Sequence, residues 1–231
     1  YRDHYLNNKA EVMNTDSKID VRDEKAMRKV VEEFNPDLVI HTAAKTNIDW
    51  AEQNKTECFE INTLGSDIIG KICQEKGIYL VFLSSGCVLE SKSAEDAQTE
   101  NVVPSPLCFY SWTKVWAEEM LMHRARRNGL KLLVLRPRQL LSAKVDPRNA
   151  LTKMLTYNKF INTPNSCTVV EDLMMVTDTL VQKEESGVFN VANPGVTTPL
   201  EIATALKEIV KPEMEFVIIS KEELNKMTLA E

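Results

Sequence analysis

The chain of 231 residues is long enough to bury a sizeable core and to form one domain, or one domain with a smaller lobe. Its net charge of −6 at pH 7 argues against a surface for nucleic acid or for anionic membranes. The apolar runs have strand length, which predicts no membrane span, and no signal segment stands at the start. The five cysteines and three histidines lack metal-ligand spacing, which predicts no metal site and a reduced, cytosolic protein.

Helical and strand-like segments alternate along the first part of the chain. The predicted elements are helices at 23–34, 57–75 and 110–128 and strands at 37–41, 79–83 and 130–135. Lys76-Gly77 and Asn128-Gly129 are typical helix ends, and Pro137 stops the last strand. Near-continuous apolar strands between helices predict a Rossmann-like, doubly wound parallel sheet with helices on both faces. The carboxyl ends of such strands meet at one edge, where ligands bind.

The alternation loosens after Ser142. The expected elements there are helices at about 149–158, 171–183 and 199–210 and strands near 187–191 and 215–219. The sequence therefore predicts a dinucleotide-binding domain over 1–141 and a substrate-binding lobe over 142–231. The strand near 187–191 is a candidate to return to the sheet.

Ser85, Tyr110 and Lys114 form a candidate catalytic set. Ser85 follows the predicted strand 79–83, so its hydroxyl lies at the carboxyl end of the sheet. Tyr110 and Lys114 stand four residues apart and share one face of a helix. An ammonium beside a phenol favours the phenolate, so we expect Lys114 to lower the pKa of Tyr110. Tyr5 and Lys9 have the same spacing, but no strand with a serine precedes them.

Three further segments extend this set: Asp20-Val21, Ile40-His41-Thr42-Ala43-Ala44 and Ile61-Asn62-Thr63. With them the chain resembles the extended short-chain dehydrogenase/reductase superfamily. The resemblance is to its nucleotide-sugar branch, which includes the dTDP-4-dehydrorhamnose reductases. It implies a dinucleotide cofactor, NADPH in preference to NAD, and a superfamily habit of two-fold homodimers through the Tyr110 helix. The positions it implies for the cofactor are Asp20, Val21, Ala43, Ala44, Asn62 and Lys114.

A closer resemblance covers most of residues 36–227, and it is to bifunctional 3,5-epimerase/4-reductases that make UDP-L-rhamnose. The segments that carry it are Asn47-Ile48-Asp49-Trp50, Ser85-Gly86-Cys87-Val88-Leu89-Glu90, Pro147 to Lys153, Pro164-Asn165-Ser166-Cys167-Thr168 and Asn193-Pro194-Gly195-Val196. It implies a UDP- or dTDP-linked 4-keto-6-deoxy sugar as substrate. The C3 and C5 protons of such a sugar are acidified by the carbonyl, so inversion needs an acid and a base.

The same resemblance implies a role for each site residue. Cys87 and Lys153 match the acid/base pair of the epimerisation. Tyr110 then supplies the proton of the reduction at C4, Ser85 bonds the C4 oxygen, and Lys114 binds the nicotinamide ribose. The positions implied for substrate binding are Arg148, Asn149 and Asn165.

Other readings of four of these residues stay open. Asp20 also fits a cap for a helix that starts near Arg22, and Asn62 also fits a solvent-facing position in mid-helix. Cys87 also fits a small buried apolar residue, and Lys153 an ordinary solvated charge.

The phosphate-binding Gly-x-x-Gly-x-x-Gly turn is not found, since no glycine precedes Gly65. Such a turn with its strand and helix start takes roughly 25–30 residues ahead of a position like Asp20. We therefore expect a fragment truncated at its N-terminus, with weak or no dinucleotide binding by these 231 residues alone.

Three other functions compete with this one. A 4-epimerase uses the same Ser85, Tyr110 and Lys114. A 4,6-dehydratase is disfavoured because Gly86-Cys87 stand where those enzymes have Asp-Glu. A non-catalytic regulatory subunit of the same fold, as in methionine adenosyltransferase, needs none of the five catalytic residues that this chain retains.

Overall fold

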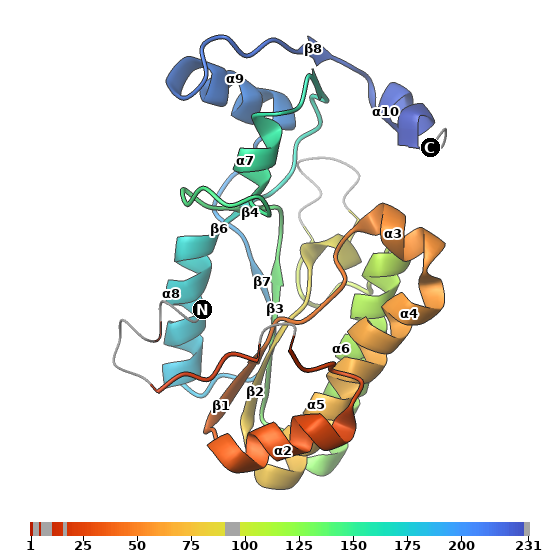
Figure 1. The fold of residues 1–231 in the computed structure, drawn as a ribbon, viewed down its shortest axis with the longest axis vertical. Helices are drawn as coiled ribbons and strands as arrows, with labels where there is room; N and C mark the ends of the chain where they lie inside the picture. Colours follow the sequence, from red (N-terminus) through yellow and green to blue (C-terminus); the bar gives the residue numbers. More distant parts are fainter. Residues whose placement is uncertain (2–4, 6–10, 16–17, 91–97, 229–231) are drawn as a thin grey trace. The chain divides into compact units, whose positions relative to one another are not determined.

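The computed structural model describes residues 1, 5, 11–15, 18–90 and 98–228, and it is a mixed α/β protein (Figure 1). Its contacts divide the chain into two compact units. The first contains the described residues up to Glu90, Gln98–Arg136 and Val176–Asn190, and the second contains Pro137–Met175 and the residues from Val191 onward. The division falls a few residues before the predicted boundary at 141/142, and the segment 176–190 belongs with the first unit. The predicted domains 1–141 and 142–231 stay a prediction.

A four-stranded sheet forms the centre of the first unit, in the order β1-β2-β3-β7. Its strands are β1 (Leu38–His41), β2 (Tyr79–Leu83), β3 (Leu132–Pro137) and β7 (Gly187–Val191). The pairs β1–β2 and β2–β3 are parallel, with Val39 opposite Leu80 and Leu80 opposite Leu132. The predicted Rossmann-like parallel sheet is thus confirmed. The strand expected near 187–191 is its fourth member, next to β3.

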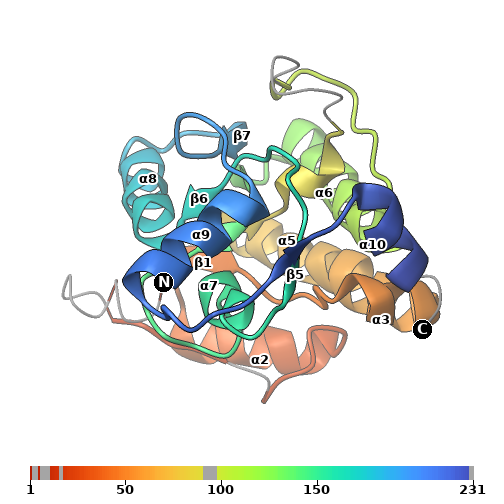
Figure 2. The same cartoon turned by 90° about the horizontal axis from the view of Figure 1, so that it is seen from above.

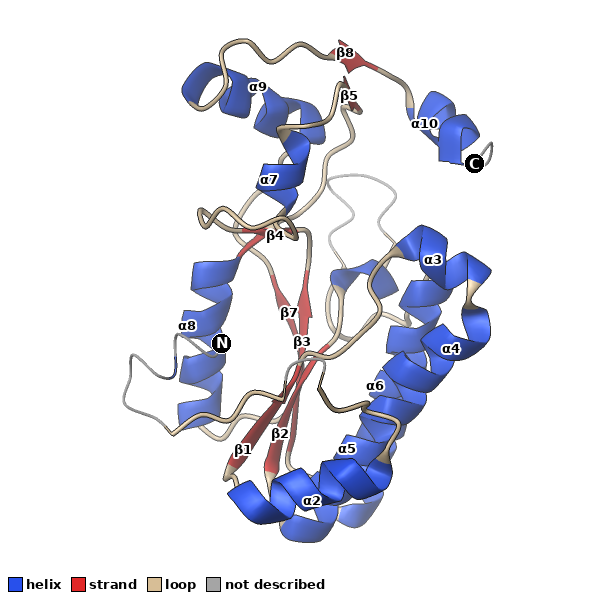
Figure 3. Ribbon diagram, in the orientation of Figure 1, coloured by secondary structure: helices blue, strands red, loops and turns tan. Residues whose placement is uncertain are grey.

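Three helices cover one face of this sheet, α2 (Glu24–Phe34), α5 (Gly65–Lys76) and α6 (Phe109–Asn128). Their buried side chains and those of the strands form one apolar core, made chiefly of Met27, Val31, Ile69, Ile72, Leu80, Phe82, Leu121, Leu132 and Val134. Figure 3 shows α8 (Val170–Gln182) on the other side of the sheet from α5 and α6. Helices on both faces let the strands bury both of their sides, which explains their continuous apolar runs.

The helix predicted over 57–75 is interrupted. It consists of α4 (Lys55–Phe59), a π-helical turn η1 (Glu60–Leu64) and α5, which ends at Gly77 in the left-handed conformation. A short helix that the sequence analysis did not predict, α3 (Ile48–Gln53), precedes it and is capped by the side chain of Asn47.

The strand predicted over 130–135 begins two residues later, at Leu132, and runs to Pro137. Leu130 belongs to the C-terminal cap of α6 instead. It follows Gly129, which is in the left-handed conformation, and its N–H donates to the Arg124 carbonyl.

The second unit contains short elements around a small core. They are α7 (Ala150–Met154), α9 (Pro199–Ile209), α10 (Lys221–Thr228), β4 (Leu140–Leu141), β5 (Lys159–Phe160), β6 (Thr168–Val169) and β8 (Val217–Ile218). β4 pairs with β6 and β5 with β8, both in parallel. Figure 2 shows α7 beside α9, and the core residues there are Met154, Phe160, Ala203 and Met214. The helix predicted over 149–158 ends early because the chain turns after Met154 into β5.

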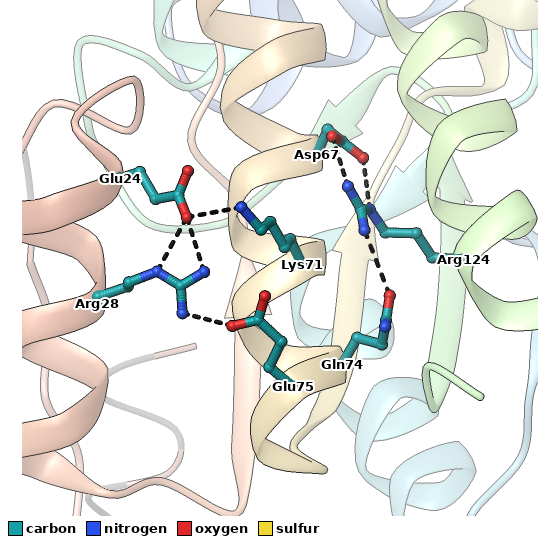
Figure 4. A network of polar contacts seen from close by, with 7 residues as sticks. All are labelled: Glu24, Arg28, Asp67, Lys71, Gln74, Glu75 and Arg124. Carbon is teal, nitrogen blue, oxygen red and sulfur yellow. Dashed lines mark hydrogen bonds and ion pairs between the residues drawn. The ribbon is translucent and has the colours of Figure 1, made fainter. Parts of the chain in front are cut away.

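The outer surface of α2, α5 and α6 carries a network of ion pairs (Figure 4). Arg28 joins Glu24 at 2.7 Å and Glu75 at 2.5 Å, and Lys71 also reaches Glu24. A second group joins Asp67 and Gln74 of α5 to Arg124 of α6, and its Arg124–Asp67 pair is about four-fifths buried. Exposed pairs contribute little stability one by one, but the first group links α2 to α5 and the second links α5 to α6.

Candidate active site

Two serines follow the last residue of β2. Ser85 begins the short 3-10 helix η2 (Gly86–Val88), and its Oγ accepts a hydrogen bond from the Cys87 N–H at 3.2 Å. Both Ser84 and Ser85 are buried. The sharp turn at the strand end therefore holds the Ser85 hydroxyl at the carboxyl edge of the sheet, as the sequence predicts.

Tyr110 lies in the first turn of α6, and its hydroxyl shares a hydrogen bond with the Ser85 side chain. Burial, and next the charge of a Cys87 thiolate, raise the pKa of Tyr110 to about 12, while the bond from Ser85 acts in the opposite direction. The expectation that Lys114 lowers this pKa is wrong in this structure, because desolvation of the phenolate outweighs the contacts that stabilise it. Tyr110 is thus a neutral phenol with Ser85 and Cys87 as neighbours.

Lys114 is buried one helical turn after Tyr110. Its Nζ lies over the Phe82 ring, 4.4 Å from the ring centroid. Burial lowers the pKa of Lys114 to about 8, and the carboxylate of Glu118 opposes that effect. Within the described ranges the ammonium has no hydrogen-bond partner. Its N–H groups are therefore available to a ligand that carries hydroxyl groups.

His41 closes the same region from the end of β1. Its ring stacks on Phe82 with centroids 5.8 Å apart, and its Nε2 lies 3.0 Å from the Ser66 Oγ. Burial, together with the charge of Lys114, lowers the pKa of His41 to about 3. His41 is therefore neutral at physiological pH, and Lys114 carries the positive charge of this site.

Asn62 connects the loop after β1 to α6. Its Oδ1 accepts from the Lys45 N–H at 2.7 Å, and its Nδ2 donates to the Lys45 carbonyl and to Thr113 Oγ1, each at 3.0 Å. Thr113 in turn donates to the Tyr110 carbonyl at 2.6 Å. Asn62 is fully buried in the π-helical turn, so the solvent-facing alternative is wrong. Its amide fixes the Ala43-Ala44 loop relative to Tyr110.

Asp20 lies just before α2 but does not cap it. The cap is Asp23, whose carboxylate accepts from the Ala26 N–H at 3.0 Å, so the capping alternative for Asp20 is wrong. Asp20 instead binds the guanidinium of Arg22 with both oxygens, at 2.6 to 3.1 Å, which lowers its pKa to about 2. Val21 packs against α5, where a Cβ added to Gly65 would lie 2.5 Å from its Cγ2.

Four predicted site residues belong to the second unit. Lys153 is exposed in the last turn of α7, and Arg148 is exposed and paired with Asp146 at 3.1 Å. Asn165 accepts a hydrogen bond from Arg138 Nε at 2.9 Å. The roles of these residues in catalysis and in substrate binding stay predictions.

Asn149, the fourth of them, is the N-terminal cap of α7. Its Oδ1 accepts from the Leu151 N–H at 3.2 Å, and its Nδ2 donates to the carbonyls of Ser142 at 2.6 Å and Lys144 at 2.8 Å. Both ends of the amide thus hold the loop that leads into α7, and its contact with substrate stays a prediction.

The sequence analysis missed a buried ion pair beneath the site. Glu118 of α6 and Arg136 of β3 are each 4% exposed, and Arg136 Nη2 lies 2.5 Å from Glu118 Oε2. Ser84 also bonds the Glu118 carboxylate. The sequence feature that pointed to Glu118 is its position four residues after Lys114, which puts both side chains on the same helix face.

The described part of the chain holds no cluster of three or more histidine, cysteine or acidic side chains that could ligate a metal ion. Nor does any described helix combine the length and the apolar character needed to cross a bilayer.

Known proteins resemble this chain over nearly its whole length. The family model for the RmlD substrate binding domain matches residues 3–226. A bifunctional dTDP-4-dehydrorhamnose 3,5-epimerase/reductase of Arabidopsis thaliana is 30% identical over 87% of the chain and 68% of that protein. The chain is also 30% identical, over 91% of its length, to the trifunctional UDP-rhamnose enzyme RHM1 of the same plant, of which it spans 32%.

Solved structures share the fold. The crystal structure of the L780 UDP-rhamnose synthase of Acanthamoeba polyphaga mimivirus has a TM-score of 0.86 and is 27% identical, with 98% of this chain and 81% of that chain covered. A dTDP-4-dehydrorhamnose reductase of Bacillus anthracis, solved in complex with NADP, has a TM-score of 0.82 and is 22% identical. The match covers 96% of this chain and 81% of that chain. The chain therefore belongs to the RmlD substrate binding domain family, within the extended short-chain dehydrogenase/reductases.

Proposed function

We propose that this protein reduces a nucleotide-linked 4-keto-6-deoxy sugar with NADPH and also catalyses 3,5-epimerisation of that sugar. The observation that supports this most directly is the contact of Tyr110 with Ser85 and Cys87 at the carboxyl edge of the sheet, with the buried Lys114 one helical turn after Tyr110. A reductase needs a proton donor, a partner for the carbonyl oxygen and a nearby cation, and these side chains supply all three.

The residues of the site fit a dinucleotide. The buried ammonium of Lys114 has open N–H donors for the hydroxyls of a ribose. Ala43 and Ala44 lie in the loop after β1, at the same sheet edge. Their small side chains leave the backbone of this loop accessible. NADPH supplies the hydride when it is bound.

In the reduction, Tyr110 gives its Oη proton to the C4 oxygen as the carbonyl becomes a hydroxyl. Ser85 orients that oxygen by a hydrogen bond, and after the transfer its hydroxyl stabilises the phenolate left on Tyr110. The high pKa of Tyr110 suits this direction, since the phenol starts protonated.

For the epimerisation we propose that Cys87 and Lys153 exchange protons with C3 and C5. Cys87 lies beside Tyr110 and is part-exposed, so a sugar ring held by Tyr110 comes within reach of its thiol. Lys153 belongs to the second unit and is exposed.

We further infer that the protein is cytosolic, and its unpaired cysteines support this inference. Two-fold dimers through α6 stay a prediction.

The test is a product assay with the Tyr110→Phe variant. The purified full-length protein is incubated with NADPH and UDP- or dTDP-4-keto-6-deoxyglucose, and the deoxyhexose product is identified by mass spectrometry and NMR. Loss of the proton donor lowers the reduction rate by about 10²–10⁴-fold, while binding of the nucleotide sugar persists. The matched control is Tyr157→Phe, which makes the same change at an exposed position of the second unit and retains the parent rate.

The same assay separates the other candidate functions. A 4-epimerase consumes no NADPH and returns a sugar of unchanged oxidation state. A non-catalytic subunit gives no product, and its Tyr110→Phe variant then behaves as the parent protein does. Either result overturns the proposed reductase.

A further inference from the structure

A buried triad of Ser84, Glu118 and Arg136 lies directly beneath the candidate active site. Arg136 Nε lies 3.0 Å and 3.2 Å from the two oxygens of Glu118, and Nη2 lies 2.5 Å from the second. Ser84 bonds the first oxygen. The mechanism proposed above uses none of these groups.

Stability alone is a weak reason for such a pair. The desolvation of two buried charges commonly offsets their attraction, so apolar residues of similar volume often serve a fold equally well. Arg136 Nη1 is also buried without a partner within the described ranges, which adds to the cost. The triad therefore calls for a role besides packing.

The position of the triad suggests that role. Glu118 is one helical turn from Lys114 on the buried face of α6, and Ser84 is the chain neighbour of Ser85. The carboxylate thus contacts the strand end that carries Ser85 and lies on the same buried helix face as Lys114.

The charged and titratable groups around Lys114 come from three elements. Glu118 lies on its own helix, His41 approaches from β1 and Cys58 from α4, while the ring of Phe82 of β2 lies against the ammonium. His41 is neutral, and burial disfavours the charged form of Lys114. Among the groups that favour the charged form, Glu118 has the largest effect.

We propose that Glu118 is a positioning residue of the reductase site, whose carboxylate, aimed by Arg136, keeps Lys114 an ammonium and ties the Ser84-Ser85 strand end to α6. The role of Glu118 in catalysis rests on the proposed function. Its effect on the charge of Lys114 can be measured without substrate.

The test is a direct titration of Lys114 by NMR in protein labelled with 13C and 15N at lysine, with the resonance assigned by its loss in Lys114→Arg. We expect the midpoint of the parent protein near pH 8, because burial lowers the pKa of Lys114. Replacing Glu118 by glutamine keeps an acceptor for Ser84 but removes the charge, and it lowers the midpoint by about 1 unit or more. The matched control Asp67→Asn breaks the other carboxylate–guanidinium pair of α6, shown in Figure 4, and leaves the midpoint in place.

A second variant covers the case in which an unpaired Arg136 prevents folding. The double change Glu118→Leu with Arg136→Met replaces both charges by apolar side chains of similar size, which buried pairs commonly tolerate. It removes the carboxylate together with its partner charge, and we expect a lowered midpoint here too, because Glu118 is the group that most favours the charged form of Lys114. A folded variant of either kind that keeps the parent midpoint overturns the proposal.

The pH profile of the reduction gives an independent readout. If Glu118 acts through Lys114, the alkaline limb of kcat/KM moves to lower pH in Glu118→Gln. A purely structural role lowers the rate at every pH and leaves the limb where it was. The NMR titration needs no substrate, so its failure counts against Glu118 alone, whereas absence of product in the parent protein counts against the proposed function.

Discussion

Lys114 shows how one residue combines a stability penalty with a functional benefit. Its ammonium is buried against Phe82, next to a neutral His41, and desolvation lowers its pKa to about 8. A cation in such a place is destabilising for the fold. The same lack of water strengthens its electrostatic effect on a ligand bound beside it.

Removing this cation therefore stabilises the protein. The folded pKa of about 8 lies below the unfolded value of about 10.4, so the unfolded state binds more protons between these limits. The penalty is complete below pH 8 and fades as the pH rises toward 10.4. We expect Lys114→Met to raise the free energy of unfolding at pH 7 by up to about 3 kcal/mol, and by much less at pH 10.

Urea unfolding of both proteins at pH 7 and pH 10 measures this difference. Lys25→Met, at an exposed position of α2, is the control and stays within about 0.5 kcal/mol of the parent protein. A Lys114→Met variant that is less stable than the parent at pH 7 contradicts the assignment of a buried ammonium.

At the scale of elements, the junction of η1 and α5 places the cofactor side of the site. The π-helical turn buries Asn62, whose amide holds the loop after β1, and Gly65 follows at the start of α5. A Cβ at Gly65 would lie 2.5 Å from Val21 Cγ2 and 3.1 Å from Val21 Cβ. A glycine is thus required for the close approach of the Asp20-Val21 segment to this helix.

Gly65→Ala tests that close approach. The overpacking costs about 1–3 kcal/mol, which exceeds the gain of up to about 1 kcal/mol from better helix propensity. Val21→Ala removes the Cγ2 atom, so in that background the same change at Gly65 becomes neutral or stabilising. A double-mutant cycle of urea unfolding measures the coupling, and additive effects of the two changes refute the contact.

At the scale of the whole molecule, the core around the sheet and the core of the second unit share no described residue. The first surrounds the sheet and includes Ile72, and the second contains Phe160 beside Ala203. Four of the five predicted catalytic residues belong to the first unit, and Lys153 belongs to the second.

Separate cores predict separate effects of core truncation. Ile72→Ala and Phe160→Ala each leave a cavity and cost about 2–5 kcal/mol locally. We expect amide hydrogen exchange to accelerate mainly in the unit that carries the substitution. Equal acceleration in both units after Phe160→Ala indicates instead one cooperative structure.

The order of helices and strands and the set Ser85, Tyr110 and Lys114 were predictable because they depend on neighbours in the chain. Apolar periodicity marks β2 and α6, and a spacing of four residues sets Tyr110 and Lys114 on one helix face. A helix or strand with such a local pattern forms in any fold that buries its apolar face.

Other features depend on residues far apart in the sequence, and only the tertiary structure decides them. The π-helical turn arises where Asn62 meets Lys45 and Thr113, and Glu118 finds Arg136 across α6 and β3. The high pKa of Tyr110 likewise follows from how deeply the fold buries its ring. Burial and long-range pairing set the energy of a charge, so the motif predicted which groups share one helix face but not how readily each one ionises.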